Sequence, residues 1–163
     1  MDLTGTALLQ SLENQRAHVI GILDGLADEA LLKPVLPTGW SCAGLVQHLA
    51  LDVERFWFRS VVAGEPTGQF YPADDLPSAW LVADTDSPED VLQSYRNEIE
   101  LANQIITATP IDAPPAAWPD FFGDFRLPDL RAVMLHVITE TACHAGHLDA
   151  ARELLDGRTW LTL

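Results

Sequence analysis

The feature that most constrains the fold of this chain is a long helical stretch near its C-terminus, from Pro128 to Gly157. Apolar residues recur in it at helical spacing, and no proline interrupts it after the first residue. Proline favours the first helical position and glycine the position after the last turn. We therefore predict one long helix with Pro128 at N1 and Gly157 just beyond its end. Most of the stability of such a helix comes from packing against other elements, so we look for its partners in the rest of the chain.

Four side chains able to bind a metal lie along one face of this helix. His136, Glu140 and His144 recur every four residues, and His147 follows three residues later. Residues with these spacings lie about 5–6 Å apart at Cβ. The flanking apolar positions turn part of this face toward the core, where unpaired charges are costly. The pattern therefore predicts a metal site or a buried hydrogen-bond network, with a solvated polar face as the alternative.

The rest of the chain supplies three more helical segments. Apolar residues recur at helical spacing over residues 3–27 and 41–63, and Ser87-Pro88 begins a third segment that runs to about residue 108. No stretch alternates like a strand of useful length. Two proline-rich connections of roughly twenty residues each precede the last two helices, a length that is uncommon inside compact domains. We predict a single all-α domain over residues 1–163, a four-helix bundle with long crossover connections.

The second helix carries a further candidate ligand, because His48 and Asp52 lie one turn apart within its apolar stripe. Taken alone, His48 is more typical of a core histidine than of a ligand. Asp52 either orients the imidazole of His48 or is a solvated acid on the helix face. The aromatic residues of the two connections either cap the core or line a pocket: Phe70, Tyr71, Trp80, Trp118, Phe121, Phe122 and Phe125.

The charge and cysteine content exclude several classes of protein. Asp and Glu outnumber Lys and Arg by 24 to 9, and the formal net charge of −15 repels nucleic acids and anionic lipids. Nothing approaches about eighteen uninterrupted apolar residues, and the N-terminus does not resemble a signal peptide. We expect a cytoplasmic protein that binds neither nucleic acid nor membrane. Cys42 and Cys143 do not make a disulfide framework, and we expect Cys143 to be a packed thiol.

Two stretches resemble the DinB-like superfamily of bacterial four-helix-bundle proteins, which includes the mycothiol-dependent maleylpyruvate isomerases and the thiol S-transferases. They are GWSCAGLVQHLALDVERFWF and LHVITETACHAGHLDAARELLDG, and their positions extend the resemblance to essentially the whole chain. In that family one His of the second helix and two groups four residues apart on the last helix hold a divalent metal. Carried over, these are His48, Glu140 and His144. Many relatives have His in place of Glu140, whereas the isomerase branch has a carboxylate. His147 is the alternative third ligand.

Two imidazoles and one carboxylate leave coordination positions open, as catalytic metal sites do. The donor set suits Zn²⁺, with Ni²⁺ or Fe²⁺ as alternatives. The resemblance implies a low-molecular-weight thiol of the mycothiol type, whose thiolate attacks an electrophilic substrate. His147, or else His136, is the candidate general base, although either could instead hydrogen-bond to a ligand. The resulting prediction is a metal-dependent thiol S-transferase or isomerase that forms a homodimer. The alternatives are a non-catalytic metal- or ligand-binding bundle and a metal-free bundle.

Overall fold

The computed structural model describes residues 2–66 and 79–160. Over these two ranges the chain is helical and contains no strand, which confirms the predicted all-α class. In chain order the elements are α1 (Leu3–Leu23), α2 (Asp28–Leu31), α3 (Cys42–His48), η1 (Leu49–Val62), α4 (Pro88–Ala108), η3 (Asp120–Phe122) and α5 (Leu130–Asp156).

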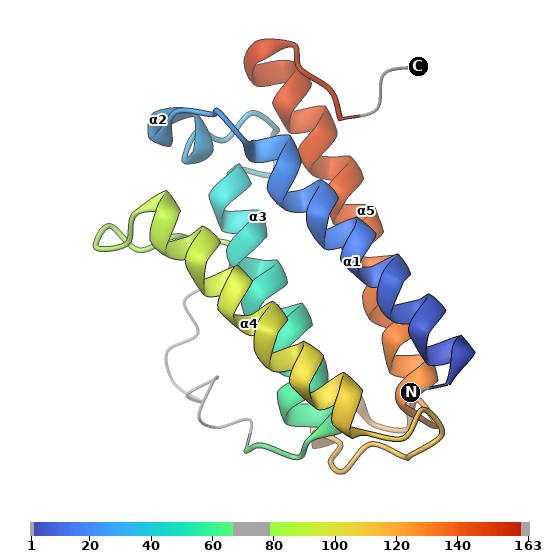
Figure 1. Ribbon diagram of the computed structural model, residues 1–163. Helices are drawn as coiled ribbons and strands as arrows, with labels where there is room; N and C mark the ends of the chain where they lie inside the picture. Colours follow the sequence, from blue (N-terminus) through green and yellow to red (C-terminus); the bar gives the residue numbers. More distant parts are fainter. Residues whose placement is uncertain (1, 67–78, 161–163) are drawn as a thin grey trace.

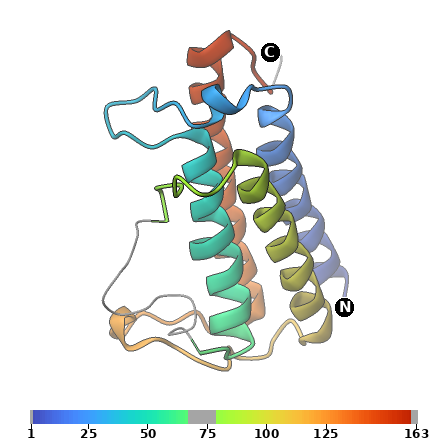
Figure 2. The ribbon, with the colours of Figure 1, turned by 90° about the vertical axis from the view of Figure 1, so that its left-hand side faces the viewer.

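The long helices form a bundle in which two parallel pairs face each other. α1 packs along α5, α3 and η1 pack along α4, and η1 also contacts α5. α1 and α5 run in one direction, whereas α3, η1 and α4 run in the other (Figures 1 and 2). The end of η1 and the start of α4 therefore lie at opposite ends of the bundle. The connection between them crosses over, as predicted.

The second long connection, residues 109–129, does not cross over. α4 ends and α5 begins at the same end of the bundle (Figure 2), so for this connection the prediction is wrong. The physical reason is that its backbone is hydrogen-bonded across that end. The amides of Ala116 and Ala117 donate to the carbonyls of Val62 and Val61, at 3.2 and 3.1 Å, so the connection is held against the last turn of η1.

The ends of the helices follow the local sequence closely, with two errors. The first helix is predicted to reach residue 27, but α1 ends at Leu23, and Gly25 follows with a φ of 73°. Ser87 caps α4 in a capping box with Asp90, and Gly157 ends α5 in the left-handed conformation with φ 80°. Pro128, however, is not the first residue of α5. The carboxylate of Asp129 accepts a hydrogen bond from the amide of Ala132, so Asp129 is the N-cap and the helix begins at Leu130, two residues after Pro128.

The second predicted helix has the expected extent but not the expected winding. η1 continues α3 without a break from Leu49 to Val62 as a π-helix. Its last turn is closed by the amide of Ala63, which donates to the carbonyl of Phe58, five residues back, at 3.0 Å. π-helical turns are rare and are frequently found at functional sites. Here the wider winding begins directly after His48.

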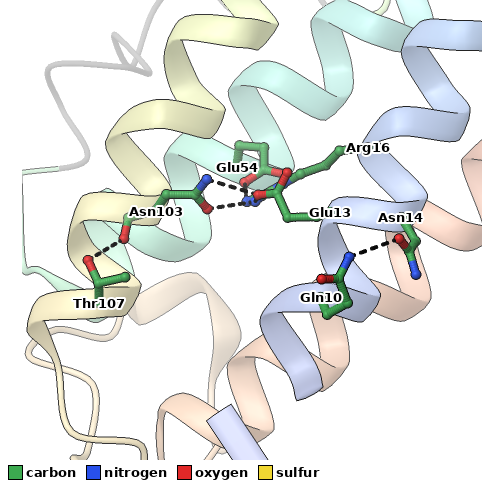
Figure 3. Close-up of polar contacts among 7 residues, drawn as sticks. All are labelled: Gln10, Glu13, Asn14, Arg16, Glu54, Asn103 and Thr107. Atoms are coloured by element: carbon green, nitrogen blue, oxygen red, sulfur yellow. Dashed lines mark hydrogen bonds and ion pairs between the residues drawn. The ribbon is translucent and has the colours of Figure 1, made fainter. Parts of the chain in front are cut away.

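A buried ion pair ties α1 to η1. The guanidinium of Arg16 donates from Nε and Nη2 to the two carboxylate oxygens of Glu54, at 2.7 and 2.6 Å, and the two residues are 1% and 0% exposed. Nη1 of Arg16 also donates to Glu13 and to Asn103 of α4 (Figure 3). Because both charges are removed from water, these hydrogen bonds must offset a large desolvation cost.

Candidate functional site

The structure brings the second-helix histidine to the last helix. His48 is the last residue of α3, and its ring meets the ring of His144 on α5 edge-on, with centroids 5.1 Å apart. Nδ1 of His48 lies 2.8 Å from a carboxylate oxygen of Asp52. Asp52 is therefore not merely a solvated acid on the helix face. A carboxylate on Nδ1 leaves Nε2 of His48 as the ring nitrogen that can bind a ligand.

His144 lies at the centre of the site, since its ring is close to several candidate groups. Its Nε2 is 3.8 Å from a carboxylate oxygen of Glu140, one turn earlier on α5. Its Nδ1 is 3.3 Å from Nδ1 of His147. Burial, reinforced by the neighbouring His48 and His147, lowers the pKa of His144 to about 4, while Glu140 acts in the opposite direction. The imidazole of His144 is therefore neutral at pH 7 and retains a lone pair for a metal.

The contact between His144 and His147 restricts the proton positions on the two rings. Two ring nitrogens 3.3 Å apart form a hydrogen bond only if one of them carries the proton. If Nδ1 of His144 donates to Nδ1 of His147, then Nε2 of His144 is unprotonated and can act as a ligand. His147 is itself exposed, and its ring lies 6.2 Å from that of Trp40. His147 thus lies on the solvent side of the site.

His136 is the first of the four candidate ligands along α5, and it lies in an aromatic environment. Its ring packs edge-on against Trp57, with centroids 4.4 Å apart, and burial lowers its pKa. Trp57 in turn contacts Phe122 and Trp118 of the second connection. His136 therefore belongs to the aromatic end of the bundle, two helical turns away from His144.

The two roles considered for the connection aromatics are divided between the two connections. Trp80, from the first, stacks on His48 with centroids 4.1 Å apart and planes 17° apart, and also contacts His144. Trp80 therefore lines the site. The aromatic residues of the second connection cover the end of the bundle around Phe56 and Trp57: Trp118, Phe121, Phe122 and Phe125. Phe70 and Tyr71 lie outside the described residues.

Sequence reasoning overlooked Trp40 and assigned the wrong environment to a cysteine. Nothing in the helical periodicity could place Trp40 beside His147, because Trp40 precedes α3 in an irregular segment. Cys143 was predicted to be packed, but it is exposed. Its neighbour His144 faces the bundle, and the next position on a helix points about 100° away, which here is toward solvent. Cys42 is buried, and burial raises the pKa of its thiol to about 11. Both cysteines are free.

The side chains of the candidate metal site are of types that bind metals, but they are not positioned as a complete set of ligands. Over residues 2–66 and 79–160, no three His, Cys, Asp or Glu side chains are arranged so that they could hold a metal ion. His48 and His144 are adjacent, and the side chain of Glu140 is 40% exposed, so it can change rotamer at little cost. The donor types present therefore suit a two-histidine, one-carboxylate site, but in this arrangement only the two imidazoles are adjacent. None of the described helices is long and apolar enough to cross a membrane.

Comparison with known proteins identifies one family. The model of the mycothiol S-transferase family matches residues 7–157, from the first turns of α1 to the end of α5. The match includes His48, Glu140, His144 and His147, and it confirms the resemblance drawn from the two sequence stretches. No curated protein and no solved structure gives a significant match.

Proposed function

Because the chain belongs to the mycothiol S-transferase family, we propose that it is an enzyme that transfers a mycothiol-type thiol to an electrophilic substrate at a divalent metal. The proposed ligands are His48, Glu140 and His144, and Zn²⁺ suits them, with Ni²⁺ or Fe²⁺ as alternatives. The observation that carries the proposal is the contact between His48 of α3 and His144 of α5. These two helices place two imidazoles side by side at a half-buried position.

The surroundings of the two imidazoles favour the forms that bind a metal. Asp52 accepts from Nδ1–H of His48, which fixes the tautomer with a lone pair on Nε2. His144 is neutral at pH 7 because burial holds its pKa far below its usual value. Glu140 supplies one negative charge near His144, and that charge would partly balance a divalent cation. When bound, the metal would act as a Lewis acid that favours the thiolate over the thiol.

His147 is the proposed proton acceptor. It is exposed and adjacent to His144, so a thiol that reaches the site also reaches the ring of His147. In the proposed reaction the S–H bond breaks and its proton passes to the imidazole of His147. The sulfur electron pair forms the new C–S bond, and the displaced pair leaves with the halide of a haloarene or moves to the oxygen of an opened epoxide or of an enolate. His147 then releases the proton to solvent, or to the leaving group, and returns to its neutral form.

The test is a comparison of thiols and variants in one assay. The protein is loaded with Zn²⁺ and incubated with mycothiol and a panel of electrophiles that includes haloarenes, epoxides and enones. Thioether formation is followed by mass spectrometry. We expect turnover with mycothiol in the wild type, a large loss in His144→Ala and a smaller loss in His147→Ala. An unrelated histidine, His18, pairs with Asp149 on the opposite side of α5, so His18→Ala serves as the matched control.

The same assay separates the alternative function. If Zn²⁺ binds and chelation lowers the melting temperature, but no thiol reacts or competes for the site, the protein is a non-catalytic metal-binding bundle. If no metal binds at all, the contact between His48 and His144 is part of a hydrogen-bonded network without a metal. The predicted homodimer is tested separately by sedimentation velocity.

A further inference from the structure

A short segment before α4 lies directly over the two imidazoles. Residues Ala79, Trp80 and Leu81, here called the Trp80 strap, belong to the first long connection. The indole of Trp80 stacks on the ring of His48 and contacts the ring of His144 at 5.6 Å. One face of the imidazole pair is therefore covered by an aromatic side chain from another part of the chain.

A single amide of α3 holds both sides of the strap. Nε2 of Gln47 donates to the carbonyl of Ala79 and to that of Leu81, each at 3.0 Å. These two carbonyls flank Trp80, so the bidentate contact fixes the backbone on either side of the indole. Gln47, whose amide holds the strap, is the residue immediately before His48, whose ring the strap covers.

A glycine allows the strap to approach the helix this closely. A Cβ built at Gly44 would lie 2.2 Å from the carbonyl oxygen of Trp80 and 3.1 Å from its carbonyl carbon. Backbone atoms cannot yield as the end of a flexible side chain can, so any other residue at position 44 would displace the strap. Gly44, Gln47 and His48 have the i, i+3, i+4 spacing of one helix face. This face of α3 is therefore shaped to seat the strap.

We propose that the Trp80 strap is a positioning element that sets the orientation of the His48 ring for metal binding. This inference rests on the proposed function. The hydrogen bond to Asp52 restrains one ring nitrogen of His48, but the ring can still tilt about that bond. Stacking against Trp80 removes this freedom, because the two planes lie within 17° of each other. The strap also covers one face of the imidazole pair, whereas His147 is exposed to solvent.

The test uses matched glycine variants and a conservative tryptophan variant. Gly44→Ala displaces the strap, whereas Gly146→Ala adds the same methyl group to α5 where nothing lies within 4 Å of it. Trp80→Ala removes the stacked ring, and Trp80→Phe retains an aromatic ring in the same place. Circular dichroism shows whether each variant keeps its helix content. The measured quantities are the Kd for Zn²⁺ and the absorption spectrum of the Co²⁺-substituted protein, which reports ligand geometry.

We expect Trp80→Ala and Gly44→Ala to raise the Kd for Zn²⁺ about tenfold, equivalent to about 1.4 kcal/mol, and to alter the Co²⁺ spectrum. Trp80→Phe and Gly146→Ala should behave like the wild type. Unchanged Zn²⁺ affinity and an unchanged Co²⁺ spectrum in both Trp80→Ala and Gly44→Ala would overturn the inference.

A second measurement, on the metal-free protein, separates this inference from the proposed function. Protons of an imidazole stacked on an indole are shifted upfield in NMR spectra. We expect this shift for His48 in the wild type and its loss in Gly44→Ala. Absence of the shift in the folded wild type overturns the inference. If the shift is present but the wild type binds no Zn²⁺, the proposed function fails while the ordering of His48 by the strap is supported.

Discussion

The hydrogen bond between His48 and Asp52 gives a selective prediction about the metal site. Asp52→Asn has nearly the same shape as the native side chain, so we expect the bundle to fold normally. It replaces a charged acceptor, 2.8 Å from Nδ1 of His48, by a neutral amide. The variant should therefore bind Zn²⁺ more weakly than the wild type without a comparable loss of stability.

The expected magnitude follows from the type of contact. A hydrogen bond to a charged group contributes about 1.5–3 kcal/mol, compared with about 0.5–1.5 kcal/mol for a neutral one. The difference of about 1–1.5 kcal/mol corresponds to about a tenfold change in Kd. If the new amide turns to donate its N–H to Nδ1 of His48, the proton moves to Nε2 and that nitrogen can no longer bind a metal. We therefore expect a ten- to hundredfold loss, about the size seen when hydrogen-bond partners of metal ligands are removed.

The assay is calorimetric titration with Zn²⁺, with Asp149→Asn as the matched control. Asp149 makes the same kind of contact, 2.9 Å from Nε2 of His18, but on the α1 side of α5. The control should bind Zn²⁺ like the wild type. Equal affinities for wild type and Asp52→Asn would refute the role assigned to Asp52, and an equal loss in both variants would show that the effect is not specific to the site.

Three further predictions concern stability. Arg16→Met leaves Glu54 buried without its bidentate partner, so urea denaturation should show a loss of about 3–5 kcal/mol, much of it recovered when Glu54→Leu is added. A loss in the single variant no larger than that of a surface substitution would contradict this. In the metal-free protein, the free energy of unfolding should fall as the pH drops from about 6.5 to about 4, because His144 takes up its proton at a higher pH in the unfolded chain than in the folded one. In His144→Gln the free energy of unfolding should depend less on pH over this range. Gly157→Ala should lower the free energy of unfolding by about 1 kcal/mol in a thermal melt, since φ is 80°; an unchanged melting temperature would contradict the strain argument.

The fold was predictable to the extent that it depends on local signals. Helical periodicity and the caps at Ser87 and Gly157 act within a few residues, and they give the positions of the long helices nearly correctly. The ion pair between Arg16 and Glu54 joins residues 38 positions apart, and no local pattern records which helix faces meet. The course of the second connection depends in the same way on hydrogen bonds to the last turn of η1, so it could not be predicted from its proline content.

The candidate site was predictable where it lies on helices. The i, i+4 spacing of Glu140 and His144 placed them on one face, and the resemblance paired them with His48, whose ring does contact that of His144. The stacking of Trp80 on His48 was not predictable, because Trp80 lies in an irregular segment whose position is set by Gln47 and Gly44. The sequence of a loop shows that it contains aromatic residues, but it does not show which helix they pack against.

The measurement that tests the proposed metal site most directly is the Zn²⁺ content of the purified protein, determined by elemental analysis after dialysis against Zn²⁺ and then against buffer. We expect about one equivalent per chain for the wild type and for His18→Ala, and a substoichiometric content for His144→Ala. The proposed metal site is contradicted if the wild type retains no stoichiometric metal, or if His144→Ala retains as much metal and is as stable as the wild type.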